Sequence, residues 1–257
     1  MVLAKNKELK DSQISKRCFI IGNGPSIKDI DLKRLKDEQT FVVNTIWNHP
    51  DYQNMNPKYH VGIDADLFPK DKKDNFYTAD LKKEHNKPPS ATKMFFNIIG
   101  KDYIEQHDLF SKNKVYYLAT GGFFRENLKF NIDIDRVVPN PKNVIISCLI
   151  TAVYMGFKEL YLLGCEHGFL SNPSQADIQH FDGQKEYDFK NADNLNFYVV
   201  YKKSYEEQID QVKILFKNYR LLKTKLAKEN PQVKIYNATP NSFLDVFPYI
   251  KYENIKL

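Results

Sequence analysis

The sequence lacks any long apolar run and has few cysteines. No window of the 257 residues approaches the ~20 uninterrupted apolar residues that span a bilayer, and the polar N-terminus has no signal-peptide core. Cys18, Cys148 and Cys165 lie in apolar runs without C-x-x-C spacing, so we expect buried free thiols rather than disulfides or zinc ligands. These absences predict a cytoplasmic protein.

The charged residues are also not concentrated in any one stretch of the sequence. The chain is 42% hydrophobic and 27% charged, as in soluble globular proteins, and its net charge of +6 is spread along its length. No basic stripe with interleaved aromatic residues is present, so we expect no nucleic-acid partner. The positive charge leaves open an anionic substrate, an anionic membrane surface or general solubility.

Several common motifs are missing. No lysine follows the glycines at 22 and 24 as in a Walker A loop, and the third glycine of G-x-G-x-x-G is absent, which disfavours a P-loop kinase and a dinucleotide oxidoreductase. No G-x-S-x-G elbow is present either. Hydrolysis through a covalent enzyme intermediate is therefore disfavoured.

The sequence of residues 17–35 predicts a strand, a glycine turn and the start of a helix. Gly22 and Gly24 allow a close approach that a Cβ would block, and the first N–H groups of a helix point into such a turn. Pro25 suits an early helical position, and Ser26 can cap nearby donors. Together with Asn23, these residues form either a phosphate cradle or only a tight βα turn.

The rest of the chain alternates between strands and helices. This pattern predicts an α/β fold with a doubly wound, mostly parallel, Rossmann-like sheet. After the first strand, we expect strands over residues 40–44, 59–64, 93–98, 114–119, 159–164 and 233–237, and helices over 144–157 and within 195–229. Residues 1–16 form a polar lead, and 17–257 form one catalytic domain. Two polar segments, 66–91 and 168–196, are candidate lids.

Small or polar residues recur where the predicted strands end. They are the glycine turn, Asn44, Asp64, and the run from Gly164 to His167. Because ligands of doubly wound sheets bind at the carboxyl ends of the strands, these residues predict a ligand site. Asp64 and Asp66 could bind a ribose, a metal-water shell or an acceptor hydroxyl, or could only cap a turn.

Three residues are candidates for proton transfer. Glu166 and His167 directly follow a predicted strand, and His180 lies on the polar segment beyond it. Their spacing matches no standard zinc motif, so we expect a general base or a proton donor to the leaving phosphate rather than a metal site.

The chain also resembles a known family. The set GNGPS (22–26), VVN (42–44), GFKELYLLGCEH (156–167), HFD (180–182) and VKIYNATPNSFLDVF (233–247) resembles bacterial surface-polysaccharide glycosyltransferases of the 6-hydroxymethylpterin diphosphokinase-like and motility accessory factor group. It resembles the bacterial lipooligosaccharide sialyltransferases more distantly. The likeness covers residues 17 to about 249.

The resemblance implies a nucleotide site. In the sialyltransferases, the positions that match Asn23 and Asn44 help to hold the cytidine nucleotide, and the Pro-Asn-Ser turn at Asn241 and Ser242 lines the same site. The histidine base of those enzymes has no counterpart in residues 201–205. His167 or His180 must therefore be proposed independently.

These observations predict a glycosyltransferase that moves a sugar from a nucleotide donor, with a CMP-activated sialic acid-like or Kdo-like sugar favoured. The acceptor would be a cell-surface glycan, such as lipopolysaccharide or capsule, or its lipid-linked precursor, with peripheral contact at the inner membrane. No cofactor is required for this reaction. The alternatives are a Mg²⁺-dependent diphosphokinase acting on a pterin-like alcohol, with Asp64, Asp66 and Glu166 holding the ion, and a non-catalytic nucleotide-binding assembly protein.

Overall fold

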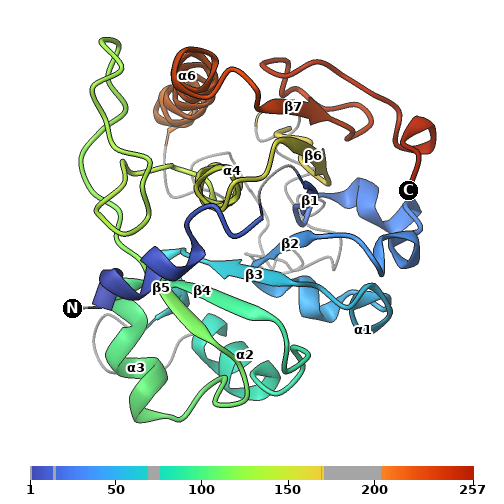
Figure 1. The fold of residues 1–257 in the computed structure, drawn as a ribbon, viewed down its shortest axis with the longest axis vertical. Helices are drawn as coiled ribbons and strands as arrows, with labels where there is room; N and C mark the ends of the chain where they lie inside the picture. The colour runs from blue at the N-terminus through green and yellow to red at the C-terminus, as the bar shows by residue number, and fades with distance from the viewer. Residues whose placement is uncertain (1, 14–15, 69–75, 169, 171–203) are drawn as a thin grey trace.

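The computed structural model describes residues 2–13, 16–68, 76–168, 170 and 204–257. Within them, seven parallel strands form one sheet in the order β5-β4-β3-β2-β1-β6-β7 (Figure 1). The strands are β1 (Arg17–Ile21), β2 (Thr40–Val43), β3 (Tyr59–Gly62), β4 (Lys93–Asn97), β5 (Val115–Leu118), β6 (Glu159–Leu163) and β7 (Lys234–Asn237). Each coincides with a predicted strand, so the doubly wound α/β fold is confirmed.

The strands are apolar on both faces because helical layers cover both sides of the sheet. Along β1, Cys18 and Ile20 face one core cluster, and Phe19 and Ile21 face the other. Aromatic rings stack between neighbouring strands; the ring centroids of Phe19 and Tyr161 are 5.1 Å apart. All three cysteines are buried free thiols, as predicted, and burial raises their thiol pKa values.

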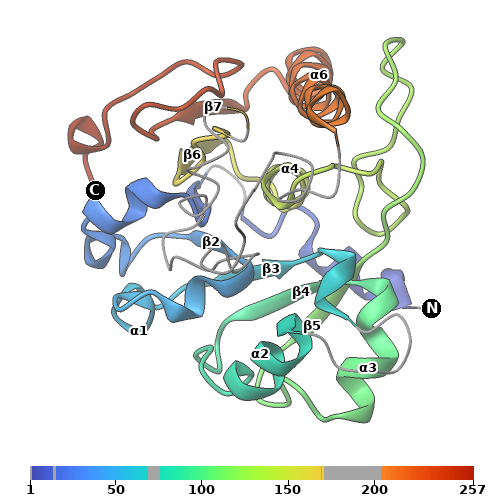
Figure 2. The same ribbon diagram turned by 180° about the vertical axis from the view of Figure 1, so that it is seen from behind.

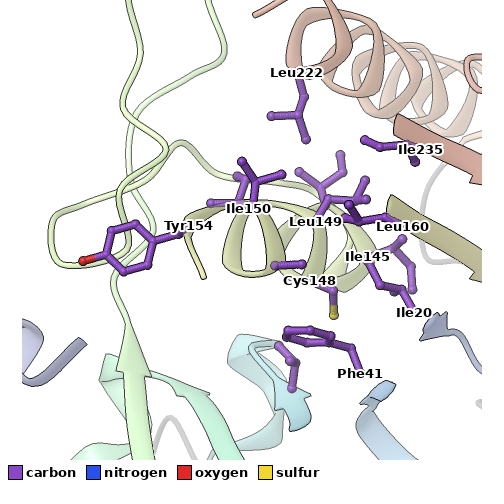
Figure 3. Close-up of a cluster of buried hydrophobic side chains, with 14 of the residues drawn as sticks. Ile20, Phe41, Ile145, Cys148, Leu149, Ile150, Tyr154, Leu160, Leu222 and Ile235 are labelled. Atoms are coloured by element: carbon purple, nitrogen blue, oxygen red, sulfur yellow. The ribbon is translucent and has the colours of Figure 1, made fainter. Parts of the chain in front are cut away.

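The helices α4 (Val144–Tyr154) and α6 (Tyr205–Glu229) cover one face of the sheet (Figure 1). Residues 145–154 of α4 are all buried, as expected of a helix that is apolar all round. Figure 3 shows why: Leu149 and its neighbours lie between Phe41 of the sheet and Leu222 of α6. The predicted helices over 144–157 and within 195–229 therefore correspond to α4 and α6, with residues 195–203 outside the described part.

Short helices cover the other face (Figure 2). They are η2 (Pro25–Asp29), η3 (Leu32–Leu35), η4 (Asn44–Asn48), α1 (Tyr52–Met55), η5 (Ala65–Leu67), α2 (Phe76–Glu84), η6 (Ile98–Gly100) and α3 (Lys101–Gln106). The helix expected after the glycine turn is thus two short 3₁₀ segments. In the first candidate lid, α2 buries Leu81, and Trp47 Nε1 donates to Asp80 Oδ2 at 3.0 Å, so residues 76–84 are a layer of the fold rather than a lid.

The two ends of the described chain pack on opposite parts of the sheet. The polar lead contains a 3₁₀ helix, η1 (Val2–Leu9), whose buried Asn6 donates from Nδ2 to Tyr117 O (2.8 Å) and Ile134 O (2.7 Å). The last segment, η9 (Tyr252–Asn254), packs near β1 through the Tyr252 hydroxyl, which donates to Asp31 O at 3.3 Å. No helix in the described ranges is both long enough and apolar enough to cross a membrane.

The sheet has one topological switch point, between β1 and β6. From β1 the chain proceeds outward through β2, β3, β4 and β5, and then returns to place β6 and β7 on the other side of β1. In doubly wound folds, ligands bind at such a switch point, beyond the carboxyl ends of the strands. The glycine turn and the Gly164–His167 run are the two loops that border it.

Candidate functional site

The turns after β1 and β6 are bonded directly to each other. Gly22 N donates to Leu163 O at 2.8 Å, and Gly24 N donates to Gly164 O at 2.9 Å. A Cβ on Gly22 would lie 2.3 Å from Gly164 O, so only glycine permits this approach. Gly164 itself has φ +61°, and a Cβ there would lie 2.4 Å from Ile27 Cγ2. The close contact between the two turns therefore requires glycine at positions 22 and 164.

A neighbouring carboxylate, that of Glu166, explains why residue 24 is glycine. Ser26 N donates to Glu166 Oε1 at 2.7 Å, and a Cβ on Gly24 would lie 1.5 Å from Glu166 Oε2. The Glu166 carboxylate therefore occupies the position beside Gly24 where the sequence predicted a phosphate. The amides of Gly22, Gly24 and Ser26 all donate within the protein. Pro25, which has no N–H, begins η2.

A third turn, after β7, fixes the backbone of this loop. Ser242 Oγ donates to Cys165 O at 2.6 Å, and Phe243 N donates to Glu166 O at 2.8 Å. Cys165 N in turn donates to Thr239 Oγ1 at 3.0 Å. The predicted Pro-Asn-Ser turn thus lies at the site and supports it. Asn241 of that turn is exposed and has φ +53°.

The two asparagines that the resemblance singled out lie on neighbouring strand ends. Asn23 is 6% exposed and donates from Nδ2 to Thr45 Oγ1 at 3.2 Å. Asn44 follows β2 with φ +44°, and its carbonyl oxygen accepts a hydrogen bond from His60 Nε2 at 2.7 Å. The structure therefore brings Asn23 and Asn44 together beside the glycine turn.

Four side-chain atoms at these strand ends are buried and have no hydrogen-bond partner among the described residues: Asn23 Oδ1, Ser26 Oγ, Asn44 Oδ1 and Glu166 Oε2. An unsatisfied buried polar atom costs about 1–3 kcal/mol. Most polar groups in folded proteins avoid this cost, so unsatisfied atoms grouped at one place need an explanation. A ligand that bonds to them at the switch point supplies one.

The side chain of His167 is buried just beyond the end of β6. Its side chain is 8% exposed, its Nδ1 donates to Cys165 O at 2.9 Å, and its Nε2 accepts from the Tyr219 hydroxyl at 2.9 Å. Burial lowers its pKa to about 4. Because both ring nitrogens are bonded inside the protein, His167 ties the β6 loop to α6. Its predicted role in proton transfer stays a prediction.

The remaining predicted residues are not gathered at this site. His180 lies outside the described residues, and Asp64 is exposed at the end of β3. β3 is three strand spacings from β6, roughly 14 Å, so Asp64 and Glu166 do not share one ion. In the described part of the chain, no three His, Cys, Asp or Glu side chains are grouped as metal ligands would be. The diphosphokinase alternative and its magnesium ion stay predictions.

Sequence reasoning missed four residues that build the site: His60, Thr45, Tyr219 and Thr239. His60 pairs in register with Val42, two residues before Asn44, and its ring also packs on Trp47 with centroids 4.7 Å apart. Burial lowers its pKa to about 4. The available signal was a histidine inside an apolar strand, which predicts a neutral, hydrogen-bonded side chain.

The chain is similar in fold to the MAf glycosyltransferase from Magnetospirillum magneticum AMB-1. The TM-score is 0.54 with 18% sequence identity, and the match covers 100% of this chain and 38% of that protein. No family model and no curated protein matches the sequence. The fold expected from the resemblance to motility accessory factor glycosyltransferases is therefore confirmed. The similarities to sialyltransferases and diphosphokinases stay predictions.

Proposed function

We propose that this protein is a glycosyltransferase that uses a nucleotide-sugar donor, with the nucleotide bound at the switch point between β1 and β6. The observation that carries the proposal is the group of unsatisfied polar atoms on Asn23, Asn44, Ser26 and Glu166, on three adjacent strand ends. The fold that this chain shares with a glycosyltransferase supports the same reaction class.

In this reaction, the bond between the sugar's anomeric carbon and the donor phosphate breaks. A hydroxyl oxygen of the acceptor forms the new bond, and its proton must pass to a base. Because His167 is occupied by internal hydrogen bonds, we assign the base to His180 on the sequence alone. We propose a CMP-activated sialic acid-like or Kdo-like sugar as donor and a lipid-linked or surface glycan as acceptor.

A nucleotide panel tests the proposal. Thermal unfolding is measured with CMP, CDP, UDP, GDP and ATP, each with and without Mg²⁺. We expect one nucleoside series to raise the melting temperature without a metal requirement, since RT ln(1 + [L]/Kd) gives about 2.7 kcal/mol of stabilisation at 100 times Kd. No response to any nucleotide contradicts the proposal. A response to ATP that needs Mg²⁺ favours the diphosphokinase instead.

A pair of asparagine variants tests where the nucleotide binds. Asn23→Ala removes an unsatisfied acceptor at the site, whereas Asn48→Ala removes an exposed asparagine from η4. We expect the first to abolish most of the nucleotide-induced shift and the second to preserve it. Equal shifts in both variants would move the site elsewhere. Donor turnover, followed by mass spectrometry, is expected to fall in His180→Ala and to persist in His107→Ala.

A further inference from the structure

Glu166 is held in place from two sides. Its Oε1 accepts from Ser26 N at 2.7 Å, and its backbone oxygen accepts from Phe243 N at 2.8 Å. The side chain is therefore fixed between the turn after β1 and the turn after β7. A carboxylate positioned this way is preorganised, so little conformational entropy is lost when it binds a ligand.

The second carboxylate oxygen is fixed but unsatisfied. Glu166 Oε2 lies against Gly24, is closed to solvent and has no partner. Asn23 Oδ1 and Asn44 Oδ1, on the adjacent strand ends, are unsatisfied acceptors as well. Asn23 is oriented by the hydrogen bond that its Nδ2 donates to Thr45. The site thus presents these acceptor oxygens beside the Ser26 hydroxyl, while the amides of Gly22, Gly24 and Ser26 already donate within the protein.

An acceptor-rich site selects a ligand group that donates hydrogen bonds. A phosphate at neutral pH offers almost only acceptors, and a negative one beside a carboxylate is repelled. A hydroxyl donates to a carboxylate in a short, charge-assisted hydrogen bond. We propose that Glu166 Oε2 binds a hydroxyl of the nucleotide-sugar ligand, and that the donor phosphate lies outside the glycine turn. This inference rests on the proposed function, because it takes the ligand to be a nucleotide sugar.

Two hydroxyl sources share this chemistry: the ribose and the transferred sugar. Calorimetry on the full chain distinguishes them, using the nucleoside monophosphate of the series selected above, its 2′-deoxy and 3′-deoxy forms, and the corresponding nucleotide sugar. A hydrogen bond to a charged group contributes about 1.5–3 kcal/mol, so we expect roughly 10- to 150-fold discrimination in the wild type. If Glu166 binds a ribose hydroxyl, the difference in affinity should appear between the monophosphate and one of its deoxy forms. If Glu166 binds the transferred sugar, it should appear between the nucleotide sugar and the monophosphate.

Three variants test whether Glu166 causes this difference in ligand affinity. Glu166→Ala is expected to reduce the ratio of the two ligands' dissociation constants to about one. Glu166→Gln is expected to remove most of the discrimination, because its amide replaces one acceptor by a donor. Glu159→Gln is the matched control at the opposite end of β6, where Glu159 Oε1 accepts from the Tyr161 hydroxyl. It is expected to keep the wild-type ratio. Circular dichroism checks that each variant is folded.

The outcomes separate this inference from the proposed function. If the wild type binds no nucleotide, both fail. If it binds nucleotide but Glu166→Ala and Glu166→Gln keep the wild-type ratios, only the role of Glu166 fails. If Glu166→Ala binds the monophosphate and inorganic phosphate more tightly than the wild type, the carboxylate is a competitor in a phosphate cradle, and the inference is overturned.

Discussion

Replacing His167 by glutamine is expected to flatten the pH dependence of stability. In the folded protein the ring is neutral, since Nδ1–H donates to Cys165 O, Nε2 accepts from Tyr219, and burial lowers the pKa to about 4. Glutamine carries one donor group and one acceptor, so it can replace both hydrogen bonds without a group that titrates between pH 4 and 7.

The magnitude follows from proton linkage. As the pH falls below 6.5, the unfolded chain takes up a proton on His167, whereas the folded chain does so only near pH 4. The unfolded state binds more protons in this window, so the free energy of unfolding falls as the pH falls. The difference between 6.5 and about 4, at about 1.36 kcal/mol per pH unit, gives about 3 kcal/mol of stability present above pH 6.5 and lost by pH 4.

The assay is urea unfolding followed by circular dichroism at several values between pH 4.5 and 7.5. Burial also lowers the pKa of His60 to about 4 and lowers that of His49, so the wild type should lose stability through three histidines. His167→Gln should remove about a third to a half of that slope, because His60 and His49 keep their contributions. Parallel curves for the wild type and His167→Gln would refute the structural role of His167. The variant should also keep its nucleotide-induced thermal shift at pH 7.5.

Two further substitutions test contacts between distant parts of the chain. Gly24→Ala would place a Cβ 1.5 Å from Glu166 Oε2, whereas the added Cβ in Gly121→Ala meets only the Val137 side chain at 3.2 Å. We expect thermal unfolding to show a large loss of stability in the first, partly restored by adding Glu166→Ala, and little change in the second. Asn6→Leu removes two buried hydrogen bonds that hold η1 on the sheet, and should cost about 2–3 kcal/mol in urea unfolding. A loss under 0.5 kcal/mol would mean that η1 contributes little to folding.

The sheet was predictable from the sequence because each strand is buried on both faces. Residues 41–43 and 160–163, for example, are apolar and buried throughout, and their order with α4 fixes the doubly wound class. The 3₁₀ segments η2, η3 and η4 were not predictable, because four or five residues span little more than one turn and cannot show a helical period. Residues 25–35 carry too few apolar positions to distinguish an α-helix from two 3₁₀ turns.

The site was only partly predictable. Strand-end position gave Asn23 and Asn44 correctly as neighbours, since parallel strands end at one edge of the sheet. The contact between Ser26 and Glu166 joins residues 140 positions apart, and nothing local in either segment indicates it. The hydrogen bond of His167 to Tyr219 was not predictable for the same reason, because Tyr219 lies on a helix 52 residues later.

The Glu166 contact also changes what the glycine turn indicates. A glycine turn between a first strand and a helix usually suggests phosphate, because glycine admits an anion close to the backbone. Here the anion beside Gly24 is the protein's own carboxylate. A ligand phosphate about 4 Å from it would be repelled by roughly 1–4 kcal/mol per charge, between the dielectric of water and that of a protein surface. That repulsion lowers affinity by about 5- to 1,000-fold. A phosphate can occupy this turn only after Glu166 leaves it, whereas a hydroxyl can donate to the carboxylate itself.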